Sequence, residues 1–158
     1  MKFKLALAIA AALCLALPAL ADDNCPPTVK QAVEKTFPGS QMKKCETETK
    51  DGKQMYEVKL KTKDGATTKM DLDPAGVVLM TQQYVAVQAV PTVVMKTFHT
   101  KYPEPDYKVT KTEKWIYPDG RTTYRVTYSG AKGQKTVVYT NEGTYVEEIE
   151  PDLDDDMD

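Results

Sequence analysis

The sequence contains one pattern twice, and this repetition limits the possible folds more than any other feature. A run of proline and large apolar residues near the start returns in the second half of the chain with the same order and spacing. The first copy is Pro26, Val29, Val33, Phe37 and Pro38, and the second is Pro91, Val94, Phe98, Tyr102 and Pro103. The turn dipeptide Asp51-Gly52 returns in the same way as Asp119-Gly120. We therefore predict two tandem repeats, at residues 24–88 and 89–150.

Each repeat is expected to open with a short amphipathic helix. Its apolar residues recur every fourth position, which places them along one stripe of a helix. The two stripes are Val29, Val33 and Phe37, and Val94, Phe98 and Tyr102. Prolines precede both stripes, where a missing N–H costs nothing, and Pro38 and Pro103 end them. Helices this short are marginal on their own, so each must lie on an apolar surface.

The rest of each repeat alternates between apolar and polar residues. Tyr56, Val58 and Leu60 alternate with charged residues, which is typical of a strand with one buried face. Asp-Gly and Lys-Gly dipeptides lie between such segments and favour hairpin turns. Strands are expected near residues 42–50, 53–62, 67–72, 77–86, 107–117, 121–129, 134–140 and 144–149. The predicted fold class is α+β, with two tandem αββββ repeats whose antiparallel sheet carries one helix per repeat on one face.

Residues 1–21 have the three-part pattern of a secretory signal peptide. Lys2 and Lys4 precede an apolar run over residues 5–17, and Ala19-Leu20-Ala21 follows as a small-residue cleavage pattern. The apolar run is too short for a stable membrane span. We predict cleavage after Ala21, a periplasmic or secreted location, and no membrane insertion after cleavage. An uncleaved anchor is the alternative.

Two cysteines remain after the predicted leader. Cys25 and Cys45 form an even pair in an exported chain, which favours one disulfide. Two buried thiols or a redox pair are the alternatives. A redox pair usually has a Cys-x-x-Cys spacing, and this spacing is absent from the sequence.

The charge balance excludes two classes of partner. The chain has 21 basic and 23 acidic residues, and five of the acids are aspartates in residues 151–158. We expect this acidic tail to be solvated and disordered. The charges between the leader and the tail nearly cancel, so the domain has no basic surface for nucleic acid or for an anionic membrane.

The residues needed for common catalytic or metal sites are scarce. His99 is the single histidine, and no P-loop, dinucleotide fingerprint or zinc-type Cys/His spacing is present. The segment 71–76 begins like a calcium loop, but Ala75 stands where an oxygen ligand is needed, so we interpret it as a turn. We predict no catalytic residue, no metal site and no cofactor.

Aromatic residues are concentrated in the second repeat, together with the only two arginines. Exposed aromatic and arginine side chains commonly anchor protein partners. The candidate protein-binding residues are Trp115, Tyr117, Tyr139, Arg121 and Arg125. The alternative is that these aromatic residues fill a small core where the repeats meet.

Several short motifs resemble the PepSY-like family of exported bacterial proteins, also described as β-lactamase-inhibitor-like. They are Thr36-Phe37-Pro38-Gly39, Asp51-Gly52, Tyr56-Glu57-Val58, and the run from Asp71 to Val78. The resemblance implies a tandem αββββ fold with helices on one sheet face and a free, concave second face. In the β-lactamase inhibitor protein that face grips an enzyme, and related PepSY modules are suggested to restrain peptidases. No inhibitory residue carries over, because the motifs consist of turn and core positions.

The resemblance implies a non-catalytic periplasmic protein-binding module that inhibits or modulates an envelope hydrolase. Its expected partner is an envelope or extracellular protein. The alternative function is a periplasmic carrier of a small ligand or a metal ion.

Overall fold

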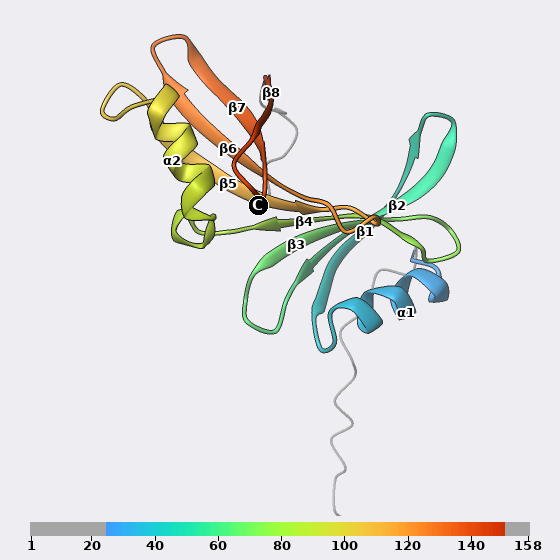
Figure 1. Ribbon diagram of the computed structural model, residues 1–158. Coiled ribbons are helices and arrows are strands. Elements are labelled where there is room, and N and C mark those ends of the chain that lie inside the picture. Colours follow the sequence, from blue (N-terminus) through green and yellow to red (C-terminus); the bar gives the residue numbers. More distant parts are fainter. Residues whose placement is uncertain (1–24, 151–158) are drawn as a thin grey trace, which may run out of the picture.

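The computed structural model describes residues 25–150, so the predicted leader (1–21) and tail (151–158) lie outside the described residues (Figure 1). The first half contains α1 (Pro27–Thr36), β1 (Gln41–Lys50), β2 (Lys53–Lys61), β3 (Thr67–Leu72) and β4 (Val78–Tyr84). A short 3₁₀ helix, η1 (Val87–Ala89), leads to α2 (Thr92–Lys101), β5 (Lys108–Ile116), β6 (Thr122–Gly130), β7 (Gly133–Thr140) and β8 (Tyr145–Ile149). The α+β class is confirmed, and every strand begins and ends within two residues of its prediction.

The eight strands form one antiparallel sheet in chain order, from β1 to β8. The two halves join where β4 pairs with β5, with Gln82 opposite Trp115 and Tyr84 opposite Glu113. The sequence predicted the strands, but not that β4 and β5 would make the two groups of four continuous.

Both helices begin and end as their prolines predict. Prolines occupy the start of α1, and Pro91 stands immediately before α2. At the other end, the N–H groups of Phe37 and Tyr102 donate to the carbonyls of Val33 and Phe98, each at 2.8 Å. The next residue in each case is a proline, which cannot continue the helical hydrogen bonds.

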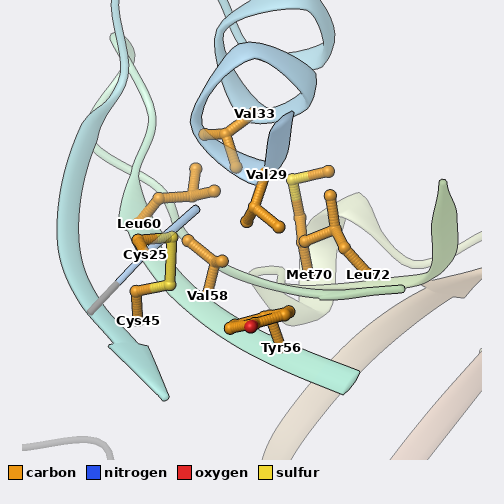
Figure 2. Close-up of a cluster of buried hydrophobic side chains, with 9 residues drawn as sticks. All are labelled: Cys25, Val29, Val33, Cys45, Tyr56, Val58, Leu60, Met70 and Leu72. Atoms are coloured by element: carbon orange, nitrogen blue, oxygen red, sulfur yellow. A yellow bond between two sulfur atoms is a disulfide. The ribbon is translucent and has the colours of Figure 1, made fainter. Parts of the chain in front are cut away.

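Helix α1 contributes to a first apolar cluster with β2 and β3 (Figure 2). In Figure 2, Val29 and Val33 point from the helix toward strand side chains such as Leu60 and Met70. The predicted disulfide is present and joins the start of α1 to β1. The first cluster consists of Cys25, Val29, Val33, Cys45, Tyr56, Val58, Leu60, Met70 and Leu72.

Helix α2 contributes to a second apolar cluster with β6 and β7. This cluster is richer in aromatic rings. Phe98 and Tyr102 stack with their centroids 5.1 Å apart, and Tyr102 lies 4.5 Å from the ring of Tyr128. The second cluster consists of Val90, Val94, Phe98, Tyr102, Tyr124, Val126, Tyr128, Val137 and Tyr139.

The register places both clusters on the same face of the sheet. Met70 of the first cluster is opposite Thr81, and Thr81 is opposite Ile116. Further along β5, on the same side as Ile116, Thr112 is opposite Val126 of the second cluster. Because side chains alternate between the faces of a strand, Met70 and Val126 point to the same side. The opposite side is the helix-free face.

The segment 71–76 forms the turn between β3 and β4. Asp73 Oδ1 accepts hydrogen bonds from the N–H groups of Ala75 at 2.9 Å and Val77 at 2.8 Å. The Asp73 carboxylate therefore stabilises the turn, and the interpretation of this segment as a turn is confirmed.

Candidate functional site

The helix-free face is unusually polar where it is buried. Lys69, Gln82 and Glu113 are only 6%, 5% and 3% exposed, respectively, although neither helix cluster lies on this side. Buried polar groups need partners because leaving them unpaired costs free energy. The side chains that define this face are Met55, Glu57, Lys69, Asp71, Met80, Gln82, Glu113, Trp115, Thr123, Arg125 and Val138.

At its centre, where the two halves of the sheet meet, Glu113 joins Gln82 and Lys111 in one network. The amide nitrogen of Gln82 donates to the Glu113 carboxylate at 2.8 Å. Lys111 lies 3.0 Å from the same carboxylate, and its ammonium lies 5.1 Å from the centroid of the Tyr84 ring. The junction is therefore held by a charged network in addition to backbone pairing.

On one side of this centre lies a groove of about 740 Å³, here called the hairpin groove, which runs along the β1–β2 hairpin. Its lining includes Met55, Asp71, Leu79, Met80 and Tyr117. Burial, and then the neighbouring Glu57 carboxylate, raises the pKa of Asp71 to about 6. The groove is thus lined by the apolar side chains of Met55, Leu79 and Met80 and by a carboxyl group with a raised pKa.

On the other side lies a groove of about 640 Å³, here called the arginine groove. It is lined by Arg121, Thr123, Arg125, Val138 and Thr140, among others, and also by Tyr117. Tyr117 therefore borders both grooves.

Arg125 and Trp115 form a stacked pair beside the arginine groove. The central guanidinium carbon of Arg125 lies 3.3 Å from the centroid of the indole, a strong cation–π arrangement. Three buried atoms here have no hydrogen-bond partner in the part of the chain that the structure describes: Trp115 Nε1, Thr123 Oγ1 and Arg125 Nε.

The structure separates the five predicted contact residues. Trp115, Tyr117 and Arg125 lie along the helix-free face. Arg121 is exposed at the end of the β5–β6 hairpin, 2.5 Å from the Asp119 carboxylate and 5.0 Å from the Tyr117 ring.

Tyr139 corrects the predicted set. It is only 1% exposed and belongs to the second apolar cluster. On β7 it shares the side of Val137, which faces α2, so it is unavailable to a partner. The alternative that some of these aromatic residues fill the core therefore holds for Tyr139.

The sequence reasoning missed Met55, Asp71 and Met80. The signal was present, because Met55 and Glu57 alternate with the buried Tyr56 and Val58 and must therefore point to the other face. Asp71 and Met80 are directly opposite each other on β3 and β4, a pairing that the separate strands do not reveal.

Residues 25–150 contain neither a candidate metal cluster nor a membrane-spanning helix. No group of three or more His, Cys, Asp or Glu side chains in this range is placed to hold a metal ion. None of the helices within residues 25–150 has the length and the apolar character needed to cross a bilayer.

Two overlapping stretches of the chain, residues 17–80 and 64–145, match the model of the family described as "Putative beta-lactamase-inhibitor-like, PepSY-like". The chain belongs to this family. Two matches within one PepSY-like chain also accord with the internal repetition of its sequence. No curated protein matches this sequence.

Solved structures with low sequence identity share the fold of this PepSY-like protein. A BLIP-like protein of Bacteroides fragilis is 19% identical, with a TM-score of 0.65, over 84% of this chain and 93% of that one. A DUF2874 family protein of Bacteroides uniformis is 17% identical, with a TM-score of 0.66, over 78% and 88%. A Bacteroides eggerthii protein described as "putative periplasmic" is 16% identical, with a TM-score of 0.65, over 78% and 86%.

Proposed function

We propose that this PepSY-like protein is a non-catalytic periplasmic module that binds another envelope protein and inhibits or modulates a hydrolase. In this proposal, the repeats 24–88 and 89–150 each pack one helix on the same side of the sheet. The partner then docks on the helix-free face. The observation that carries the proposal is the pair of grooves that meet at Tyr117 on this face.

The residues around Tyr117 suit a protein contact. Trp115, Tyr117, Arg121 and Arg125 combine aromatic rings with guanidinium groups, the side chains that dominate the binding energy of protein interfaces. Their stacking with each other fixes the rings before a partner arrives, which lowers the entropy lost on binding.

Three observations support an exported location. Residues 1–21 have the pattern of a signal peptide. The Cys25–Cys45 disulfide belongs to an oxidising compartment. A solved neighbour of the same fold carries a periplasmic description. A hydrolase is the favoured class of partner because the family description and the BLIP-like neighbour both refer to β-lactamase inhibition.

A pull-down with matched tyrosine variants tests the proposal. The protein is immobilised and exposed to periplasmic extract of its own source, and captured proteins are identified and assayed for hydrolysis. We expect the wild type to retain a hydrolase and to change its rate, and Tyr117→Ala to lose both effects. Tyr145→Ala is the control, because Tyr145 is 46% exposed and lies beside Tyr139 on the helix side.

Equal capture by Tyr117→Ala and the wild type would contradict the proposed surface, and no specific capture would contradict the function. Native mass spectrometry of the purified protein separates the carrier alternative, which requires a bound small molecule or metal ion.

A further inference from the structure

We infer that Arg125, Trp115 and Thr123 form a subsite that binds a carboxylate side chain of the partner protein. The inference rests on the proposed function and specifies which partner chemistry the arginine groove accepts.

On the helix-free face beside the arginine groove, Arg125 has no described carboxylate partner. Lys114 also lines the groove without a described ion pair, but it is opposite Tyr124 of the second apolar cluster and so belongs to the helix side. Arg121 pairs with Asp119, and Lys111 pairs with Glu113. Glu113 lies directly opposite Arg125 on β5, but its carboxylate is bound by Gln82 and Lys111. The guanidinium of Arg125 instead rests on the indole of Trp115 and forms no described ion pair with a residue of 25–150.

The donors beside this cation also lack acceptors. Thr123 is directly opposite Trp115, and Arg125 lies on the same side of β6 as Thr123. The indole N–H of Trp115 and the guanidinium of Arg125 can only donate hydrogen bonds. The buried Trp115 Nε1, Thr123 Oγ1 and Arg125 Nε have no partner within the described chain, so an acceptor ligand would relieve an unfavourable arrangement.

A carboxylate fits this donor set better than other acceptors. Its two oxygens match the planar fork of a guanidinium in a bidentate, charge-assisted pair. Glu142 and Glu147 also line the groove and are exposed. Their negative charges disfavour a dianionic ligand such as phosphate more than a singly charged carboxylate.

The partner, and not the acidic tail of this chain, is the assigned source of the carboxylate. The last described residue, Glu150, lies 3.4 Å from Lys135. Lys135 is opposite Tyr128 of the second apolar cluster, so it lies on the helix side of the sheet. The side chain of Glu150 therefore points to the side away from Arg125, whereas the arginine groove adjoins Tyr117 on the proposed docking face.

The chain offers a direct measurement, because Trp115 is its only tryptophan and Arg125 is one of two arginines. The ¹⁵N-labelled protein is titrated at constant ionic strength with the blocked peptide acetyl-Gly-Asp-Gly-amide, and separately with its asparagine counterpart. We expect saturable shifts of the Trp115 indole N–H and Arg125 Nε–H signals with the aspartate peptide. The asparagine peptide should bind at least about tenfold more weakly. Equal responses to both peptides, or no response, would overturn the inference.

Variants separate the subsite from a general charge effect. Arg125→Gln is expected to abolish saturation, and Arg125→Lys to weaken it because the bidentate fork is lost. Lys132→Gln is the control for loss of a positive charge, because Lys132 is exposed in the turn between β6 and β7 and lines neither groove. It should leave the affinity unchanged. If Arg125→Gln fails to give a folded amide spectrum, Thr123→Val tests the same donor set and should weaken binding severalfold. Loss of binding in Lys132→Gln, or full binding in folded Arg125→Gln or Thr123→Val, would contradict the assignment.

Truncation after Glu150 tests the tail as the occupant. We expect the same peptide affinity with and without residues 151–158, and tighter binding only after truncation would assign the subsite to the tail instead. The titration requires no partner, and the Tyr117 pull-down does not depend on Arg125. A protein that captures its partner but ignores the aspartate peptide therefore overturns this inference alone, and the reverse result overturns the proposed function.

Discussion

Gly76 holds the β3–β4 turn against the first turn of α1. Its φ is +83°, and a Cβ atom there would lie 2.7 Å from the carbonyl oxygen of Thr28. The side chain of Thr28 also donates to the carbonyl of Pro74 at 2.9 Å in the same turn. This position therefore demands glycine both for its backbone conformation and for the close approach of the helix.

We expect Gly76→Ala to destabilise the protein more than Gly120→Ala does. Both glycines have a φ of +83°, but nothing lies within 4 Å of a Cβ at Gly120. Each substitution carries the cost of a left-handed alanine, about 1 kcal/mol or more, and only Gly76→Ala adds a backbone clash. Urea denaturation of both variants measures the difference. Equal losses would show that the turn can withdraw from α1 without cost.

The raised pKa of Asp71, about 6 against an ordinary value of 3.8, predicts a pH-dependent effect on stability. The folded state holds the Asp71 proton more tightly than the unfolded chain, so stability is lost as pH rises from about 4 through 6. Asp71→Asn removes this loss. We expect the variant to gain stability relative to the wild type between pH 4 and pH 7.5, as measured by denaturation at both values.

A gain in stability of Asp71→Asn over the wild type that is independent of pH would contradict this account. A gain in stability that shrinks as the pH rises would also contradict it. A carboxyl ¹³C titration of the wild type gives the pKa of Asp71 directly.

Residue-level prediction from the sequence succeeded where one strand determines the answer. Alternation along the sixth predicted strand (residues 121–129) assigns Tyr124 and Tyr128 to the core, and both are buried. Alternation cannot tell which tyrosines of a neighbouring strand share that face, so Tyr139 was placed on the wrong side. The pairing of Arg125 with Trp115 has the same origin, because it depends on the register between β5 and β6.

Among the elements, the helices were the easiest to predict. Their apolar stripes and flanking prolines lie within ten residues of chain, and both helices contain the expected residues. The contact between β4 and β5 was not predictable in the same way. It joins strands that are separated by η1, α2 and a loop, and the residues that pair there are mainly polar.

The edge strand β8 depends on Glu148 for its attachment to the helix side. Tyr102, at the end of α2, donates a hydrogen bond from its hydroxyl to the Glu148 carboxylate, and Lys135 of β7 lies 3.3 Å from it. The hydrogen bond from Tyr102 is the main cause that lowers the pKa of Glu148 below its ordinary value of 4.5. This contribution to stability is therefore present above pH 4.5 and is lost as the pH falls through the lowered pKa.

We expect Glu148→Gln to cost about 1 to 2 kcal/mol of unfolding free energy at pH 7, because hydrogen bonds to charged groups contribute that much. Glu147→Gln is the matched control on the same strand, and its exposed side chain should change stability by no more than about 0.5 kcal/mol. Chemical denaturation at pH 7 and at pH 3.5 measures both. A cost for Glu148→Gln that does not diminish at pH 3.5 would argue against the ionic contact.

At the scale of the whole molecule, the described residues 25–150 contain two apolar clusters with no residue in common. The halves are connected through the β4–β5 pairing and the network around Glu113. Stability therefore has two separate apolar sources, and the connection between them is polar.

The matched core valines Val58 and Val126 test this separation. Both are 0% exposed, one in each cluster, and substitution by alanine should cost about 2 kcal/mol at either site. We expect Val58→Ala to speed native-state hydrogen exchange mainly in β2 and β3, and Val126→Ala mainly in β6 and β7. Equal acceleration across the whole sheet in either variant would mean that the halves unfold as one unit.

Among residues 25–150 the sheet remains open, so β1 and β8 each have one edge without a neighbouring strand in this part of the chain. Such borders can recruit a further chain and start fibrillar assembly. The ten residues of β1 include lysines and glutamates in close succession, among them a Lys44–Glu46 contact of 2.7 Å, and these charges oppose stacking of one molecule on the next. At the other border, β8 is only five residues long. The charges of β1 and the shortness of β8 therefore both disfavour pairing of the sheet edges between molecules.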